Sequence, residues 1–158
     1  MSTVRRWITR AERELCQEVA APPDDVRRFY ADLDNIKLVH PLLVSVRTLD
    51  RTETPDAYVQ TYRVRDRIPL GPLRLRTSYI ARLQVPVIGD MRTDARQFPR
   101  VRLRGCVAFE PTPTGSRIVE RMQIEAPWPL ASVTIRKAVE AHTEMLAGIR
   151  RAFDDAAN

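Results

Sequence analysis

Cysteine, histidine, lysine and glycine are all scarce in this chain of 158 residues, and the first two shortages limit its chemistry most. The two cysteines, Cys16 and Cys106, stand alone, and only His40 and His142 could join them around a metal ion. Zinc and redox sites use closely spaced pairs of such residues, which this sequence lacks. We therefore expect no metal, no redox centre and no cofactor, and we expect both cysteines to be buried or half-buried.

Long hydrophobic runs are also missing. No stretch approaches the roughly 20 apolar residues that cross a membrane, and the first ten residues lack the apolar core of a signal peptide. We expect a cytoplasmic protein. The length and the apolar content of 44% suit one domain, predicted over residues 13–158 after an N-terminal tail or strand extension over 1–12.

Positive charge is abundant, at a formal net of +6, and all but two of the 26 basic residues are arginines. Many arginines occupy alternate positions, which is typical of the solvated face of a sheet. No basic helix, RNA-binding aromatic set or Cys/His finger accompanies them, so we expect no nucleic-acid partner. Residues near the start could at most touch an anionic membrane, or form a frayed tail; these are Arg5, Arg6, Trp7 and Arg10.

Several catalytic motifs are absent as well. There is no GxSxG elbow, Walker loop, GxGxxG turn, HExxH helix or Ser-His-Asp order, so hydrolase, kinase, dinucleotide-binding and metalloprotease functions lack support. An enzyme of this sequence would work without a cofactor. It would hold a reactive chain in a productive conformation and use one or two proton-transfer groups.

What the sequence does have is clear periodicity. Alternating apolar and polar residues predict a half-buried antiparallel sheet of about seven strands. Short helices are expected over about 22–33 and 35–40, and one long amphipathic helix over 130–156. The expected strands include 13–19, the alternating stretch from residue 43 to about 67, 73–85, 91–97, 101–109 and 116–126.

The predicted long helix must cover the apolar face of this sheet, because no other helix is long enough. Small inward residues, Ala81, Ala95 and Gly105, leave space between the two layers. We therefore expect a cavity of a few hundred Å³, the size typical of small-ligand sites.

This order of elements, with the segments 64–76 (VRDRIPLGPLRLR) and 138–146 (AVEAHTEML), resembles the SRPBCC superfamily of START and birch-pollen-allergen-like proteins. Within it the chain looks most like the bacterial polyketide cyclase/dehydrase and lipid-transport group. The resemblance implies an α+β helix-grip fold: a curved seven-stranded antiparallel sheet wrapped around a long C-terminal helix, with two short helices after the first strand. It also implies a deep cavity for an apolar or amphiphilic molecule. The Trp-x-Ser-x-Arg strand of the aromatase branch has no match: the comparable strand, residues 77–82, reads TSYIAR, and its Arg82 falls on the outward register.

Two polar residues fall in apolar registers. Alternation places Glu120 inward, and His142 sits at the centre of the helical stripe, so the two could meet and exchange protons with a ligand. They are the catalytic candidates. Glu120 could instead form an ion pair or lie at a cavity mouth, and His142 could be a core histidine bonded to Tyr79 or Thr77.

The remaining candidates are inward-facing residues that would contact a ligand. Asp66 is also inward by alternation, but it precedes the break at 68–72 and is expected at the cavity rim or in a turn. His40 is expected at the rim or the surface. The ligand-binding candidates are Tyr62, Thr77, Tyr79, Gly105, Val107, Met122, Val139, Met145 and Leu146.

These patterns favour binding or transfer of a hydrophobic or amphiphilic small molecule, lipid-like, polyketide-like or aromatic. The alternative is a cofactor-independent cyclase, aromatase or dehydratase in which His142 and Glu120 transfer protons and Tyr79 positions a carbonyl. An interaction or regulatory protein with an incidental cavity is a third possibility. The protein would be a monomer or a homodimer.

Overall fold

The computed structural model describes residues 7–158, and it shows the expected helix-grip fold. The elements, in chain order, are β1 (Ile8–Val19), α1 (Pro23–Ala31), α2 (Leu33–Val39), β2 (Leu43–Glu53), β3 (Ala57–Leu70), β4 (Leu73–Pro86), β5 (Met91–Gln97), β6 (Val101–Thr112), β7 (Gly115–Pro127) and α3 (Trp128–Ala156). Residues 8–12 of the predicted tail or strand extension belong to β1, whereas residues 1–6, including Arg5 and Arg6, lie outside the described part.

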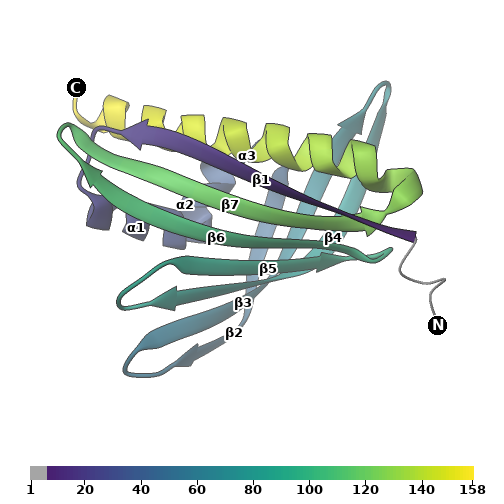
Figure 1. The fold of residues 1–158 in the computed structure, drawn as a ribbon, viewed down its shortest axis with the longest axis horizontal. Coiled ribbons are helices and arrows are strands. Elements are labelled where there is room, and N and C mark those ends of the chain that lie inside the picture. Colours follow the sequence, from purple (N-terminus) through teal and green to yellow (C-terminus); the bar gives the residue numbers. More distant parts are fainter. Residues whose placement is uncertain (1–6) are drawn as a thin grey trace.

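All seven strands form one antiparallel sheet in the order β1-β7-β6-β5-β4-β3-β2. Consecutive strands from β2 to β7 are neighbours, as their short connections predict, and β1 pairs with β7 to become the far edge. Figure 1 shows the sheet curving beneath α3, which runs alongside β1 and β7.

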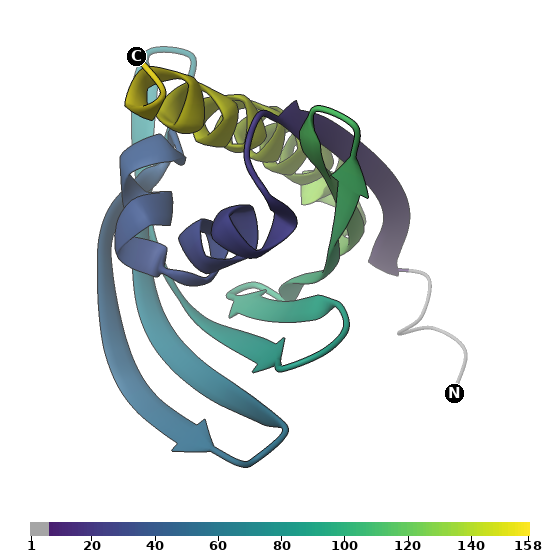
Figure 2. The ribbon, with the colours of Figure 1, turned by 90° about the vertical axis from the view of Figure 1, so that its left-hand side faces the viewer.

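The two short helices have local causes. Pro23 at the first turn of α1 is followed by Asp24 and Asp25, whose negative charges interact favourably with the positive N-terminal end of the helix dipole. Asp32 then ends α1 and caps α2, accepting a hydrogen bond from the backbone N–H of Asp34 at 3.0 Å. Seen from one end, α1 and α2 lie between the sheet and α3 (Figure 2).

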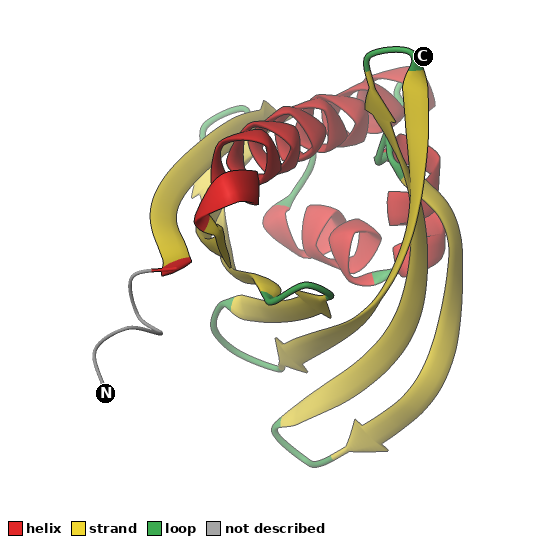
Figure 3. Ribbon diagram, turned by 90° about the vertical axis from the view of Figure 1, so that its right-hand side faces the viewer, coloured by secondary structure: helices red, strands yellow, loops and turns green. Residues whose placement is uncertain are grey.

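Packing of α3 is uneven across the sheet, and this creates internal space. The helix contacts β1 and β7 closely, while β2 to β5 curve away from it, as the view from the opposite end shows (Figure 3). The helix also touches α2 at Gly148, where an added Cβ would come under 3.0 Å from the side chain of Val39. Fully buried residues such as Ile118, Ile124 and Ile149 form the core on the closely packed side.

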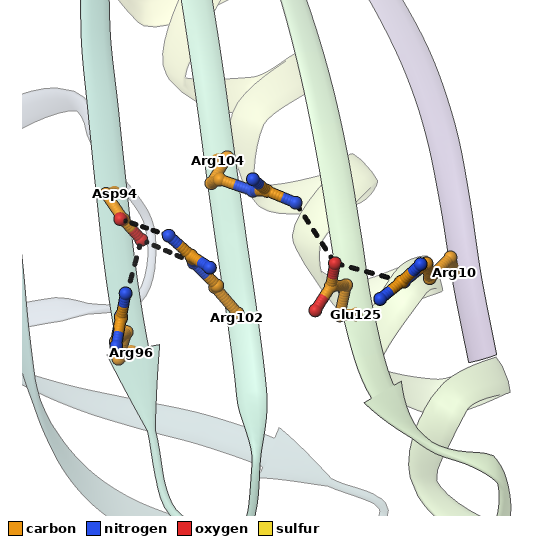
Figure 4. Close-up of polar contacts among 6 residues, drawn as sticks. All are labelled: Arg10, Asp94, Arg96, Arg102, Arg104 and Glu125. Atoms are coloured by element: carbon orange, nitrogen blue, oxygen red, sulfur yellow. Dashed lines mark hydrogen bonds and ion pairs between the residues drawn. The ribbon is translucent and has the colours of Figure 1, made fainter. Parts of the chain in front are cut away.

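The outer face of the sheet carries the arginines, and its two halves differ. On β5, β6, β7 and β1 they pair with acids: Arg102 with Asp94 at 2.7 Å, and Arg104 and Arg10 with Glu125 at 3.1 Å (Figure 4). On β2 to β4, like charges face each other across strands, as in the pairs Arg47–Arg63 and Arg67–Arg76. This solvated arginine face is the one that the alternation predicts.

Two local expectations are wrong. Cys16 is exposed, because its position on β1 faces solvent, whereas Cys106 is half-buried as expected. The strand β3 does not break at Ile68 but continues to Leu70, and the turn with Gly71 follows. Ile68 pairs with Leu75 on β4, so the cross-strand ladder extends beyond the predicted break.

Within residues 7–158, no helix has both the length and the apolar character needed to cross a membrane.

Candidate functional site

A cavity of about 650 Å³ lies between the sheet and α3. Its wall is mainly apolar, with contributions from α1, α2, β2 to β6 and α3. The volume lies within the range of small-molecule sites, so the cavity can hold a ligand of that class. A group of polar side chains from several different elements interrupts the apolar wall. It comprises Tyr30, His40, Asp66, Thr77, Tyr79 and His142.

Glu120 and His142 are in direct contact, although 22 residues separate them. Nδ1 of His142 on α3 meets Oε1 of Glu120 on β7. The second carboxylate oxygen, Oε2, accepts a hydrogen bond from the Tyr30 hydroxyl at 2.9 Å. Glu120 is only 1% exposed and does not itself line the cavity, whereas His142 does. The carboxylate therefore lies behind the imidazole and orients it toward the interior.

The electrostatics of this cluster favour an ion pair. Desolvation lowers the pKa of His142, but the charge and hydrogen bond of Glu120, together with Asp66, outweigh it, so the net pKa is raised. Burial beside Glu120 raises the pKa of Tyr30 well above its ordinary value, which keeps its hydroxyl protonated as a donor. A buried carboxylate with two partners satisfies the requirement that an interior charge be paired and hydrogen-bonded.

His40 extends the cluster. Its ring packs edge-on against that of His142, with centroids 5.7 Å apart. Its Nδ1 accepts a hydrogen bond from the backbone N–H of Leu42 at 3.2 Å. Burial, followed by the nearby His142 charge, lowers the pKa of His40 to about 3, so it stays neutral. His40 is half-buried in the loop after α2, lines the cavity and packs against α3.

Asp66 lies deeper than expected. It is 8% exposed and lines the cavity from the continuous strand β3. Burial raises its pKa to about 6, while the Tyr79 hydroxyl and His142 act in the opposite direction. The rim or turn prediction failed because the proline-containing segment after it forms strand rather than a break.

The predicted ligand-contact residues divide into two groups. Tyr62, Thr77, Tyr79 and Met145 line the cavity. The others lie outside its lining, and several belong to the tightly packed core where α3 and β7 meet; they are Gly105, Val107, Met122, Val139 and Leu146.

Gly105 acts on the cavity indirectly. A Cβ at this position would come under 3.0 Å from Oγ1 of Thr93, which does line the cavity. The glycine thus makes room for the Thr93 side chain on the neighbouring strand.

Sequence reasoning missed Tyr30, which lines the cavity and completes the Glu120 cluster. No local signal in the sequence indicates the partner of its hydroxyl, which lies 90 residues away. The general rule that a buried tyrosine hydroxyl seeks a partner could have flagged it.

Among the described residues, no group of three or more His, Cys, Asp or Glu side chains is placed to hold a metal ion. The side chains of this site offer proton transfer and hydrogen bonding within an apolar enclosure.

Known proteins share this architecture. The protein TTHA0849 of Thermus thermophilus superposes with a TM-score of 0.68 at 19% identity, covering 96% of this chain and 99% of that one. The di-domain ARO/CYC StfQ of the steffimycin biosynthetic pathway gives 0.71 at 14% identity, over 97% of this chain and 53% of its own. The Zhui aromatase/cyclase of Streptomyces sp. R1128 gives 0.62 at 12% identity, over 96% of each chain. At these identities the likeness shows the fold alone.

Sequence comparison identifies the family to which the chain belongs. No curated protein sequence matches the chain significantly. The family model described as "Polyketide cyclase / dehydrase and lipid transport" matches residues 10–154, nearly the whole chain, including every strand and helix that builds the cavity. The protein therefore belongs to the polyketide cyclase/dehydrase and lipid-transport family of the SRPBCC superfamily.

Proposed function

We propose that this protein binds or transfers a hydrophobic or amphiphilic small molecule, lipid-like, polyketide-like or aromatic, in the cavity between sheet and α3. The observation that carries the proposal is the cavity itself, about 650 Å³ with a mainly apolar wall. Burial of apolar ligand surface there would supply the driving force, about 25 cal/mol per Å². Family membership agrees with this class of ligand.

A matched pair of variants on α3 tests this proposal. Ala138 lines the cavity, whereas Ser132 is exposed on the same helix. Ala138→Trp should fill the space and weaken saturable binding of N-phenyl-1-naphthylamine, measured by fluorescence, at least tenfold, while Ser132→Trp should leave it unchanged. Native mass spectrometry of the protein purified from its own host would show a bound molecule and the oligomeric state. Absence of saturable probe binding to the unaltered protein would refute the proposal.

The second candidate is a cofactor-independent cyclase or dehydratase, which the contact between His142 and Glu120 favours. Because Nδ1 of His142 meets the carboxylate, Nε2 is the nitrogen that would exchange a proton with a ligand carbon or oxygen. Glu120 would stabilise the imidazolium form of His142, and Tyr30 would hold Glu120 in place.

Deuterium exchange at the α-carbon of an enolisable β-diketone separates the two functions. An enzyme of this kind would accelerate exchange over buffer, and His142→Gln would abolish the acceleration while retaining binding of the fluorescent probe. Exchange at the buffer rate by the unaltered protein, with the diketone demonstrably bound, would leave binding as the function.

A further inference from the structure

Two buried polar atoms in the cavity wall have no partner. Oδ1 of Asp66 and Oγ1 of Thr77 are both inaccessible to solvent, and neither makes a hydrogen bond to any of the residues 7–158. Buried polar side-chain atoms in folded proteins are mostly paired, because an unpaired one loses its hydration without compensation. Both residues line the cavity, so a rotation of either side chain would turn its unpaired oxygen toward a bound molecule that supplies the missing partner.

The two atoms belong to one place in the fold. Asp66 on β3 and Thr77 on β4 are direct cross-strand partners, and opposed side chains in an antiparallel pair start about 4.5–5.5 Å apart at Cβ. A single functional group of a ligand can therefore reach both. The Tyr79 hydroxyl, two residues along β4, lowers the pKa of Asp66, and Oδ1 of Asp66 has no partner.

Asp66 is the acidic residue of the cavity lining, and it forms no salt bridge within residues 7–158. Glu120 and His142 neutralise each other, and His40 is neutral. Lys137, which also lines the cavity, is engaged with Glu140 at 4.0 Å. The lining arginines, Arg76 and Arg82, are in exposed positions of β4.

We propose that Asp66 and Thr77 form a receptor for a hydrogen-bond donor group, a hydroxyl or a protonated amine, at the polar end of an otherwise apolar ligand. A hydroxyl would donate to Asp66 and accept from Thr77, and a protonated amine would donate to both. A carboxylate or an ether offers only lone pairs, which would face the lone pairs of Asp66. The inference rests on the proposed function and narrows its ligand class to alcohols, phenols or amines rather than fatty acids.

Competition among ligands of equal chain length tests the receptor. N-Phenyl-1-naphthylamine would be displaced at pH 7.5 by 1-decanol, decylamine, decanoate and methyl decyl ether. A hydrogen bond to a charged group corresponds to roughly a 10- to 100-fold difference in affinity. Decanol or decylamine should therefore compete at least about tenfold more strongly than decanoate or the ether.

Substitutions test which side chain causes the preference for decanol and whether the charge of Asp66 matters for binding of a protonated amine. Thr77→Val should remove most of the preference for decanol, whereas the control Thr93→Val, which deletes a hydroxyl elsewhere in the lining, should retain it. Asp66→Asn keeps an acceptor oxygen but loses the charge, so it should weaken decylamine more than decanol. An unchanged far-UV circular dichroism spectrum and an unchanged midpoint of urea unfolding would confirm that each variant is folded.

Three results would overturn the inference. The first is equal competition by decanol and methyl decyl ether, and the second is a preference for decanoate. The third is a decanol preference that survives both Thr77→Val and Asp66→Asn. In each case, saturable binding of the fluorescent probe would still support the proposed function, and only its complete absence would refute both.

Discussion

Glu120→Gln should reverse the sign of the contribution that His142 makes to the pH dependence of stability. The glutamine keeps the size of the side chain and an oxygen that can accept from Tyr30, but it removes the charge that holds the imidazolium. Desolvation, the largest single influence on the pKa of His142, would then act with only Asp66 to oppose it. We expect the pKa of His142 to fall from above its ordinary value of 6.5 to below it.

The sign of the stability effect follows from this shift. In the unaltered protein the raised pKa contributes stability that is fully present below pH 6.5 and is lost as pH rises through the folded pKa. In the variant the lowered pKa makes the folded state lose stability below pH 6.5, by about 1.4 kcal/mol per pH unit until the folded pKa is reached. At pH 5 the variant should therefore lose up to about 2 kcal/mol relative to its own stability above pH 7.5.

Urea unfolding between pH 5 and pH 8, together with NMR titration of the His142 ring, measures both effects. Asp66, with a pKa of about 6, and His40, with a pKa of about 3, also contribute to the pH dependence of stability, so the difference between the two proteins is the informative quantity. Glu140→Gln, at an exposed position of α3, serves as a charge-matched control and should leave the profile unchanged. Parallel stability curves for Glu120→Gln and the unaltered protein would refute the ion-pair assignment.

Two further substitutions test the supports of the site. Tyr30→Phe removes the donor to the buried carboxylate of Glu120 and should lower the free energy of unfolding by about 1.5–3 kcal/mol in urea denaturation; a loss below about 0.5 kcal/mol would contradict the bond. Gly105→Ala should destabilise by about 1–3 kcal/mol, because its methyl group would collide with the Thr93 hydroxyl, and Thr93→Ala should recover much of this loss in the double variant. Strictly additive effects would show that Gly105 has another role.

The order of strands and helices is largely readable from local chemistry. Period-two alternation located β4 to β7 to within a few residues, and the short helix expected over about 22–33 contains α1. These signals depend on which face of an element meets water, and that preference is local. The alternation also placed Glu120 on the inner face, where it is buried.

The prediction of a strand break was wrong because strand pairing, and not the local sequence signal, determines the structure there. The proline and glycine of segment 68–72 suggested a break, but β3 continues to Leu70 because β4 pairs with it along its whole length. That continuation moved Asp66 from a predicted rim into the cavity wall.

The helical stripe of α3 illustrates the same limit. Helical periodicity groups His142 and Leu146 on one side, yet the cavity is lined by His142 and Met145, while Leu146 packs in the core. Periodicity identifies the apolar side of a helix, but it does not show which part of that side meets a closely packed strand. The answer depends on the curvature of the sheet and the position of α3 near β1 and β7.

The sequence by itself determined the helix-grip order of elements, the arginine-covered outer face and the inward placement of Glu120, because each follows from contact with water or apolar surroundings at neighbouring positions. Only the tertiary structure decided that Tyr30, Glu120 and His142 form one cluster and that Asp66 and Thr77 face the cavity together. Those arrangements join residues up to 90 positions apart, and they depend on sheet curvature and helix position rather than on any local pattern.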